Sequence, residues 1–445
     1  MTDAPSIFWF RRDLRLTDNP ALLAAIDDGV SGQVLPLFII DPNLVSGAGL
    51  PRLAYLAQSL RALDESLGGN LHVIAGEPRE VLSQIVNAHG ASEVHVTGDF
   101  APFGSARDAH VEASGLKLIR TGSPYAISPG RVRKSDGTNY RVFTPFYNAW
   151  FQHSWRGPVG VAEANWIKPT KSERHFPKLI DDLLTPNVAG EFAASQRFER
   201  FLDGSIDKYH EHRDRPDLPG TSRLSANLRW GEIHPRTVLA PLNSSQGHTV
   251  FRKEIAWREF YADVLHHYPL TSREYYKPQF ATMRYDEPGP KFDAWRSGLT
   301  GYPLVDAGMR QLIAEGWMHN RVRMVVASFL IKDLHIEWQF GARHFMKYLI
   351  DGDMASNSHG WQWVAGCGTD ASPYYRIFNP VEQGKRFDPA GDYVRKYIPE
   401  LRHIKGGAVH EPWLLAHNAT SGYPTPVVDH SVERRESLGR LAEIK

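Results

Sequence analysis

The sequence predicts a protein of two parts, an α/β domain followed by an all-helical domain. Over the first 120 residues short apolar runs alternate with helical patterns, whereas beyond residue 191 helical patterns dominate. At 445 residues the chain is long enough to form two or three domains. We therefore expect an α/β domain over 1–125, a connector over 126–190 and a helical domain over 191–445.

The α/β prediction rests on five apolar runs separated by helical stretches. Strands joined by crossover helices pair in parallel, so these elements predict a doubly wound parallel sheet with both faces covered. No GxGxxG motif or phosphate-binding loop follows any strand, so we expect no ordinary dinucleotide site. The expected strands are Ser6–Phe10, Val34–Ile40, Leu71–Ala75, Glu93–Thr97 and Leu116–Ile119, and the expected helices are Asn19–Ala25, Arg52–Leu67, Arg79–His89 and Ser105–Ser114.

The pattern changes between Arg120 and Asn187. Glycine, proline and aromatic residues follow one another there without a clear period. Stretches of this kind run over the surface of a protein as loops. We therefore expect a long connector wrapped over the surface.

One helical stretch of the second half is apolar on nearly every side. Val322, Val325 and Phe329 recur at helical spacing, and other apolar residues fill the remaining faces, so this helix should be buried. Polar groups at the end of a buried helix need partners, which either a ligand or a structural hydrogen-bond network would supply. The polar residues near this helix are His319, Asn320, Arg321, Arg323, Asp351, Asp353 and Asn357, with Trp361 and Trp363 close in sequence.

A second cluster has two interpretations. The segment from Gly220 to Ser225, preceded by Tyr209 and Arg213, places hydroxyl and backbone N–H groups at a helix start. Such groups bind a phosphate, but they also form a plain helix N-cap. Both interpretations remain open at this stage.

A third cluster lies on one face of a predicted helix. Glu254, Trp257 and Tyr261 fall on that face at helical spacing. A carboxylate beside a flat ring suits a nucleobase, although surface ion pairing explains Glu254 equally well. The basic run from Ala371 to Lys405, with seven Lys and Arg against four Asp and Glu, is by itself typical of a solvated face.

The composition narrows the function classes. A formal net charge of +1 gives no global attraction to nucleic acid, so any DNA site must be a local patch. The single cysteine, Cys367, can form no intrachain disulfide, and no Cys/His cluster has zinc spacing, so we expect no metal and a reducing cytosol. Because the N-terminus lacks a leader pattern and no apolar run would span a bilayer, we expect a cytoplasmic protein without membrane association.

Long motifs then match a known family in order. They read FWFRRDLRLTDNPAL, GTSRLS, EIAWREF, TGYPLVDAGMRQL, GWMHNRVRM and DGDMASNSHGWQWVAGCGTDASPYYRIFNP. On these motifs nearly the whole chain resembles the DNA photolyase and cryptochrome family, most closely the class I photolyases that repair cyclobutane pyrimidine dimers. The resemblance implies a Rossmann-like antenna domain, a helical FAD-binding domain and the activity of a deoxyribodipyrimidine photo-lyase.

The resemblance implies FAD that is active as the fully reduced anion. In the family, light excites this flavin, an electron passes to the dimer, the ring splits and the electron returns, while the protein supplies binding and orientation. Asp353 would accept from the flavin imide, Arg323 would pair with Asp351, and Asn357 would lie by N5. The implied cofactor residues are Tyr209, Thr221, Ser222, Arg223, Leu224, Ser225, Trp257, Asn320, Arg323, Asp351, Gly352, Asp353 and Asn357.

The resemblance also implies UV-damaged DNA as the substrate, with the dimer flipped out of the duplex and recognised without regard to sequence. Relatives that repair (6-4) photoproducts carry histidines at the positions of Asn320 and Met324, so the cyclobutane dimer is the expected lesion. The implied catalytic residues are Glu254, Trp257, Asn320, Met324, Asn357 and Trp363, and the implied phosphate contacts are Arg213, Arg321 and Arg395.

A cryptochrome-type photosensor that signals through a partner protein is the alternative. The complete set of dimer-contacting residues and the lack of a long C-terminal extension favour the enzyme. We expect a monomer of bacterial type that associates with the nucleoid when it binds DNA.

The antenna pigment is a separate expectation. Relatives that bind methenyltetrahydrofolate carry an Asn-Glu pair at the positions of Phe103 and Gly104, and this chain lacks it. The string DFAPFGSARD resembles members that bind an 8-hydroxy-5-deazaflavin, with Arg52 and Asp99 as polar contacts. Folate or an empty domain are the alternatives.

A last expectation concerns light-driven reduction of the flavin. Family members use three tryptophans, of which Trp361 and Trp338 match the first two. The third position holds Tyr285, either as the terminal electron donor or as a packing residue. As a donor, Tyr285 would have to lose its phenolic proton on oxidation.

Overall fold

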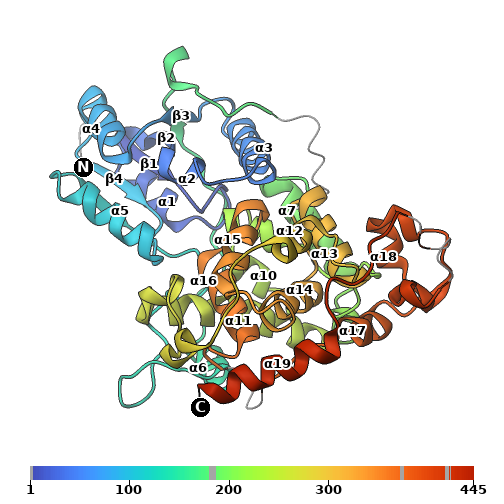
Figure 1. The fold of residues 1–445 in the computed structure, drawn as a ribbon. Helices are drawn as coiled ribbons and strands as arrows, with labels where there is room; N and C mark the ends of the chain where they lie inside the picture. The colour runs from blue at the N-terminus through green and yellow to red at the C-terminus, as the bar shows by residue number, and fades with distance from the viewer. Residues whose placement is uncertain (1–3, 180–186, 371–374, 416–419, 421, 445) are drawn as a thin grey trace. The chain divides into compact units, whose positions relative to one another are not determined.

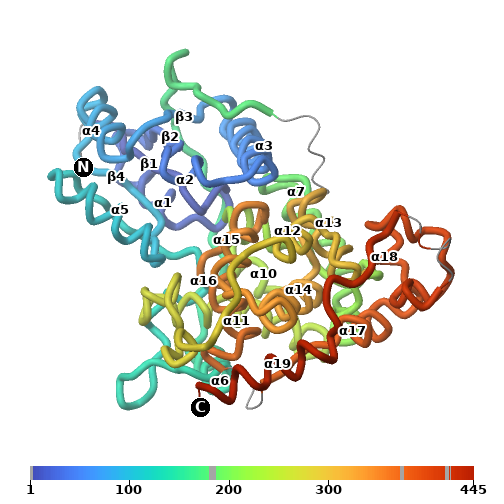
Figure 2. Tube along the Cα trace, in the orientation of Figure 1, coloured from blue at the N-terminus to red at the C-terminus, as the bar shows by residue number. Residues whose placement is uncertain are grey.

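The structure is a computed structural model. Figure 1 shows its helices and strands, and Figure 2 traces the same chain as a tube. Of the basic run at 371–405, the first four residues lie outside the described part. The described residues are 4–179, 187–370, 375–415, 420 and 422–444.

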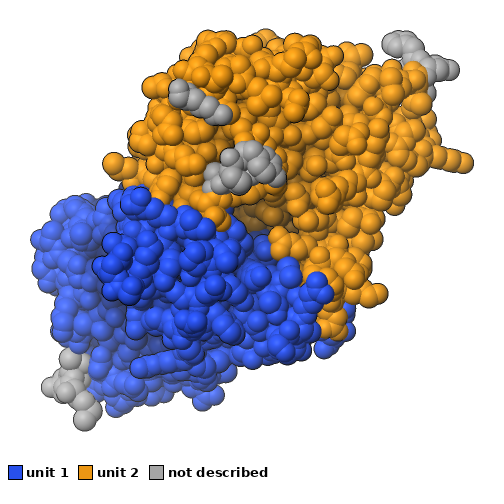
Figure 3. Space-filling model, turned by 90° about the horizontal axis from the view of Figure 1, so that it is seen from below, with its two compact units in different colours: residues 1–204, 222–269 blue, residues 205–221, 270–445 orange. Residues whose placement is uncertain are grey.

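The chain folds into two compact units, which Figure 3 colours separately. The first comprises residues 1–204 and 222–269, and the second comprises 205–221 and 270–445. The helical segment 222–269 thus clusters with the sheet, although the sequence patterns group it with the helical domain. The three-part division of the chain remains a prediction.

The first unit is built on a parallel sheet, which confirms the expected fold class. The strand order is β3-β2-β1-β4-β5, and the short strand β6 pairs with β2. In this register Ile7 lies between Leu35 and Val94. The strands are β1 Ser6–Phe10, β2 Gln33–Ile40, β3 His72–Ala75, β4 Glu93–Val96, β5 Lys117–Arg120 and β6 Asn165–Trp166.

Helices cover both faces of this sheet, because successive side chains of a strand point to opposite sides. Trp9 of β1 and Val94 of β4 share a core with Leu82 of α4, whereas α1 packs on β1 and β4 and meets His95. The helices of this unit are α1 Pro20–Asp28, α2 Pro42–Val45, α3 Leu50–Ser66, α4 Pro78–His89, α5 Pro102–Glu112, α6 Phe143–His153, α7 Glu191–Asp203, α9 Ser225–Trp230, α10 Pro235–Leu239 and α11 Gln246–His267.

The connector differs from the expectation, because it contains the helix α6. This helix packs against α11 and buries Phe143 and Trp150 in the contact. Its closely spaced aromatic residues and Pro145 hid the helical period from the sequence patterns. Glu259 of α11 accepts hydrogen bonds from the indole N–H of Trp150 at 2.6 Å and the backbone N–H of Ala126 at 2.5 Å. A buried carboxylate therefore fixes the connector to α11.

The second unit is helical, as predicted, and its core surrounds α14. Every residue of α14 from Val325 to Lys332 is buried. Gly308 of α13 allows the close contact, because a Cβ there would lie 2.9 Å from a methyl carbon of Val326. The helices are α8 Tyr209–His212, α12 Pro290–Ser297, α13 Pro303–Glu315, α14 Asn320–Lys332, α15 Trp338–Tyr348, α16 Met354–Ala365, α17 Pro380–Phe387, α18 Asp392–Tyr397 and α19 His430–Glu443.

The expected charged helix near the C-terminus is present as α19. Across the described residues, no helix combines the length and the apolar character that a membrane span requires.

One buried histidine makes the stability of the second unit depend on pH. His359 of α16 lies 3.3 Å from the hydroxyl of Thr271, measured from Nε2, and only 1% of it is exposed. Burial lowers the pKa of His359 to about 4, against the opposing attraction of Asp353. Since the folded-state pKa lies below the ordinary value of about 6.5, the unfolded chain takes up the proton first as the pH falls.

We therefore predict that His359→Gln flattens the loss of stability between about pH 6.5 and pH 4. Urea unfolding at a series of pH values measures how the free energy of unfolding changes with pH. The exposed His153→Gln is the matched control and should keep the slope of the natural chain. Equal slopes for the two variants would contradict the prediction.

Candidate functional site

In the helical unit, an ion pair joins the first turn of α14 to the turn before α16. Arg323 Nη2 donates to Asp351 Oδ2 at 2.7 Å, and Arg323 Nε donates to the carbonyl of Met318 at 2.8 Å. The pairing of Arg323 with Asp351 expected from the resemblance is therefore present. The ion pair holds the first turns of α14 and α16 near each other. At a helix start the first backbone N–H groups have no hydrogen-bond partner within the helix.

One oxygen of this carboxylate is left for another partner. Asp351 Oδ1 is buried and has no hydrogen-bond partner among the described residues. Nearby, Asp353 caps α16 by accepting from the backbone N–H of Ser356 at 3.0 Å, and Asn357 Nδ2 donates to the carbonyl of Ala342 at 3.0 Å. A buried acceptor without a partner costs stability, so this arrangement suits a ligand that brings an N–H or O–H donor.

Two buried tryptophans lie on the neighbouring helices α15 and α16. The indole N–H groups of Trp338 and Trp361 have no hydrogen-bond partner in the described part of the chain. Trp361 lies against Gly341 of α15, where any side chain would collide with its ring. The ring centroids of Trp361 and Phe345 are 4.9 Å apart, and those of Trp361 and Trp295 are 6.3 Å apart.

Trp338 contacts a tyrosine that the sequence patterns missed. Its ring lies 6.1 Å from that of Tyr275, and the Tyr275 ring stacks on Tyr285 at 6.4 Å with an interplanar angle of 24°. The Tyr275 hydroxyl donates to Glu337 Oε1 at 2.8 Å. Burial raises the pKa of Tyr285 above the ordinary tyrosine value. No sequence signal marks Tyr275, because its partners lie far along the chain.

Other predicted residues of this unit occupy the same helices or their neighbours. Asn320 is exposed at the start of α14, Met324 is half-buried, and Gly352 is buried. The indole N–H of Trp363 donates to the carbonyl of Asp370 at 3.1 Å. Tyr209 is buried on α8. Thr221 is half-buried and is the last residue of the segment 205–221, which belongs to this unit.

The three predicted phosphate contacts already have neighbours. Arg321 pairs with Asp214 at 2.9 Å, and Arg395 pairs with Asp392 at 2.6 Å. Arg213 lies over the ring of Tyr209, 5.9 Å from its centroid. Exposed or half-exposed pairs of this kind contribute little to stability and can exchange for a phosphate.

In the unit that contains the sheet, α11 presents the predicted Glu254 and Trp257. Both are half-buried, and the ring of Trp257 lies 5.4 Å from that of Tyr261, so the three share a face as expected. Phe143 of α6 stacks on Trp257 with centroids 3.7 Å apart and an angle of 7°. Phe143 fixes the plane of Trp257, and the sequence patterns missed it because they did not predict α6.

The predicted phosphate cradle coincides with a helix start, α9, in the same unit. Ser225 is its first residue, and the Ser222 hydroxyl accepts from the backbone N–H of Leu224 at 3.4 Å. Arg223 adopts a left-handed conformation with φ of 52°, which is uncommon for a residue with a side chain. The turn at Arg223 thus leads into the first turn of α9 without a glycine-rich loop.

The carboxyl ends of β1 and β4 carry a cluster of charges. Asp99 pairs with Arg107 at 3.4 Å and accepts from the backbone N–H of Ala101 at 3.2 Å. Burial would raise the pKa of Asp99, but Arg12, Arg11 and Arg107 outweigh it and hold that pKa below the usual value. Ligands of parallel sheets bind at this edge. The arginines were missed as site residues, although two directly follow the first strand.

The two predicted antenna residues have different neighbours. Arg52 of α3 lies over the ring of Trp230, 5.8 Å from its centroid, whereas Asp99 lies among the arginines just described. Gly104 of α5 is buried against Asp99, and any side chain at position 104 would collide with that carboxylate. A glutamate could not occupy position 104 without moving Asp99.

The fold and the site define a protein with a parallel α/β unit and a helical unit that carries a polar candidate site. The family model described as DNA photolyase matches residues 6–164, and that described as the FAD binding domain of DNA photolyase matches residues 251–443. The chain belongs to the DNA photolyase family, which confirms the resemblance carried by its motifs.

Relatives match over nearly the full length. The chain is 39% identical to a deoxyribodipyrimidine photo-lyase of Agrobacterium fabrum, covering 99% of this chain and 98% of the relative. A crystal structure of a bacterial class III photolyase from Agrobacterium tumefaciens superposes with a TM-score of 0.90 at 37% identity, covering 100% and 98% of the two chains. An archaeal photolyase from Sulfolobus tokodaii with two FAD molecules has a TM-score of 0.86 at 29% identity, covering 98% and 99%.

The packing of Gly104 yields a prediction about stability. Gly104→Ala should lower the free energy of unfolding by about 1–3 kcal/mol, because the added methyl group displaces Asp99 from its arginines. Urea unfolding measures the change. Gly47→Ala is the control, since a Cβ there meets nothing within 4 Å. A gain in stability at position 104, as alanine gives in an open helix, would contradict the packing argument.

Proposed function

We propose that this chain repairs cyclobutane pyrimidine dimers in DNA with light, using FAD bound in its helical unit. Its near full-length similarity to deoxyribodipyrimidine photo-lyases supports the reaction. The observation on this chain that carries the proposal is the Arg323–Asp351 pair with the unpartnered Asp351 Oδ1 beside two helix starts.

The residues of the helical unit fit a flavin. Arg323 orients Asp351, Asp351 Oδ1 accepts from a donor of the cofactor, and Asn357 lies one turn into α16 with Asp353 at its cap. When bound, reduced FAD supplies the electron that light sends to the dimer and takes it back after the ring splits. The anionic form is favoured by Asn357, whose neutral amide forces no proton onto the flavin. The roles of Tyr209, Thr221, Gly352 and Asn320, and of Ser222–Ser225 in the other unit, stay predictions.

Glu254 and Trp257 are the proposed dimer contacts on α11. Trp257 offers one ring face because Phe143 covers the other, and Glu254 accepts hydrogen bonds from a pyrimidine N–H. Stacking and an edge contact together recognise a flipped pyrimidine dimer without regard to the surrounding sequence. Trp363 is proposed to stack on the dimer, and Met324 to pack below it.

Arg213, Arg321 and Arg395 are the proposed phosphate contacts. Arg321 and Arg395 would exchange their carboxylate partners for phosphate oxygens, so DNA affinity should fall as salt rises. Action as a monomer in the cytoplasm remains a prediction.

The first test of this function is repair itself. Reduced enzyme should restore a dimer-containing oligonucleotide under blue or near-ultraviolet light and not in the dark. Glu254→Ala should slow repair or weaken dimer binding by roughly tenfold or more, because a hydrogen bond to a charged group contributes about 1.5–3 kcal/mol. The bound flavin, read from its absorbance, should be unchanged.

Glu199→Ala, an exposed glutamate on α7, is the matched control and should repair normally. Intact dimers after illumination, or better repair of (6-4) lesions, would overturn the proposal. Loss of flavin in Glu254→Ala would mean that Glu254 serves the cofactor instead.

We also propose that Tyr285 ends the path that delivers electrons for light-driven flavin reduction. Trp361 and Trp338 precede it, and the structure adds Tyr275, whose ring touches both Trp338 and Tyr285. When Tyr285 gives up an electron it must release its phenolic proton. Glu337 would receive a proton through the Tyr275 hydroxyl, which already donates to it.

Tyr285→Phe should therefore lower the yield of flavin photoreduction several-fold, while chemically reduced enzyme repairs dimers normally. Trp361→Phe should abolish photoreduction. Glu337→Gln should slow formation of the neutral tyrosyl radical, because the amide cannot take up the proton. Transient absorption measures these signals, with Tyr276→Phe as the neighbouring control. A long-lived tryptophanyl signal that Tyr285→Phe leaves unchanged would show that another residue ends the path.

The antenna proposal concerns the charged edge of the sheet. An 8-hydroxy-5-deazaflavin, with Asp99 among its contacts and Arg52 as a further candidate, suits a domain where Gly104 leaves no room for a glutamate. The arginines around Asp99 favour an anionic pigment.

Protein made in a deazaflavin-producing host should show a violet absorption band besides the flavin bands. Asp99→Asn should remove this band and leave the flavin. Glu65→Gln, an exposed carboxylate on α3, should change neither. No violet band, together with folate binding on reconstitution, would refute the choice of pigment.

A further inference from the structure

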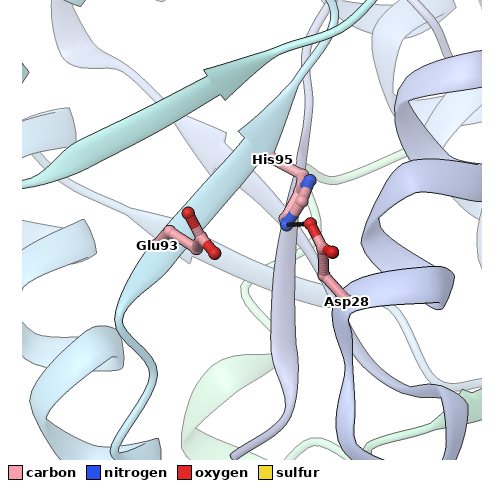
Figure 4. A group of neighbouring side chains, drawn as sticks. All are labelled: Asp28, Glu93 and His95. Atoms are coloured by element: carbon pink, nitrogen blue, oxygen red, sulfur yellow. Dashed lines mark ion pairs between the residues drawn. The ribbon is translucent and has the colours of Figure 1, made fainter. Parts of the chain in front are cut away.

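Three metal-binding side chains meet on the face of the sheet that α1 covers. Glu93 and His95 are two residues apart on β4, so both point to the same side, and Asp28 is the last residue of α1 (Figure 4). Asp28 lies far from Glu93 and His95 in the sequence, which is why no zinc-type spacing predicted the three. None of the three has a part in the proposed repair reaction.

The distances suit a single ion. One ligand atom from each side chain lies within 4.8 Å of the others. His95 Nε2 is 3.4 Å from Asp28 Oδ2. Two atoms that each lie about 2.1 Å from a tetrahedral zinc ion are about 3.4 Å apart, so this pair needs almost no movement to share one.

His95 supplies the independent indication of a ligand. It is completely buried, and neither of its ring nitrogens has a hydrogen-bond partner among the described residues. A buried imidazole in this state costs stability unless something occupies its lone pair. Its Nε2 points toward Asp28, as Figure 4 shows.

The surrounding charges favour a cation. Asp28 and Glu93 face the imidazole, and the opposing charge is Lys117, whose Nζ lies 2.9 Å from Glu93 Oε2. The side chain of Lys117 is 69% exposed. It can therefore turn into solvent when a metal ion takes its place beside Glu93. The half-exposed Asp28 leaves room for a water molecule as fourth ligand.

We propose that Asp28, Glu93 and His95 bind a divalent transition-metal ion of the zinc class and thereby fasten the end of α1 to β4. One imidazole and two carboxylates suit zinc, whereas magnesium and calcium prefer oxygen ligands alone. The ion acts on stability rather than on repair, because it would lock a helix end to the sheet.

Tag-free, chelator-stripped protein titrated with zinc in the presence of a competing indicator tests this. We expect one zinc ion per chain, a Co²⁺ adduct with the intense visible bands of a tetrahedral site, and a rise in melting temperature on zinc addition. Asp28→Asn and His95→Gln should each weaken zinc binding at least about tenfold, the loss that even an outer partner of a metal ligand causes. Repair activity should stay unchanged.

Asp27→Asn is the matched control, since Asp27 is the exposed carboxylate next to Asp28 on α1. It should keep the affinity of the natural chain, and magnesium at the same concentration should not compete. Because Asp28 is exposed, its variant tests the site even if His95→Gln folds poorly. Zinc binding to scattered surface histidines would be weak, and Asp28→Asn and Asp27→Asn would change it equally. That result would overturn the proposal.

Discussion

The burial of α14 from Val325 to Lys332 is the constraint on which the helical unit depends. A helix buried over this length keeps its charged groups near its ends, and Arg321 and Arg323 both lie in its first turn. Arg323 needs a carboxylate there, and Asp351 supplies it from the turn before α16. The same carboxylate keeps a second buried oxygen, Oδ1, without a hydrogen-bond partner among the described residues. Packing and the proposed cofactor contact thus depend on one interaction.

In the other unit a buried carboxylate has the corresponding role. Glu259 holds the connector against α11 through Trp150 and the backbone at Ala126, and burial raises the pKa of Glu259 to about 6 even though these hydrogen bonds oppose the shift. This contact brings α6 alongside α11. Phe143 then stacks on one face of Trp257. A residue of the connector therefore shapes the proposed substrate contact.

The sheet edge gathers charge without a glycine-rich loop. Guanidinium groups surround Asp99 beyond the carboxyl ends of β1 and β4 and hold its pKa below the usual value in spite of burial. These charges are the basis of the proposed pigment site, which would use side chains where a dinucleotide fold uses backbone N–H groups.

The sequence by itself determined the parallel sheet, the buried helix α14, the pairing of Arg323 with Asp351 and the family, because each depends on local periodicity or on long motifs. Only the tertiary structure revealed α6, the contact of Phe143 with Trp257, the position of Tyr275 beside Trp338, and the meeting of Asp28 with His95. These contacts join residues from 63 to 114 positions apart, and their spacing has no period. They exist only once strands and helices have packed, so no pattern along the chain could have indicated them.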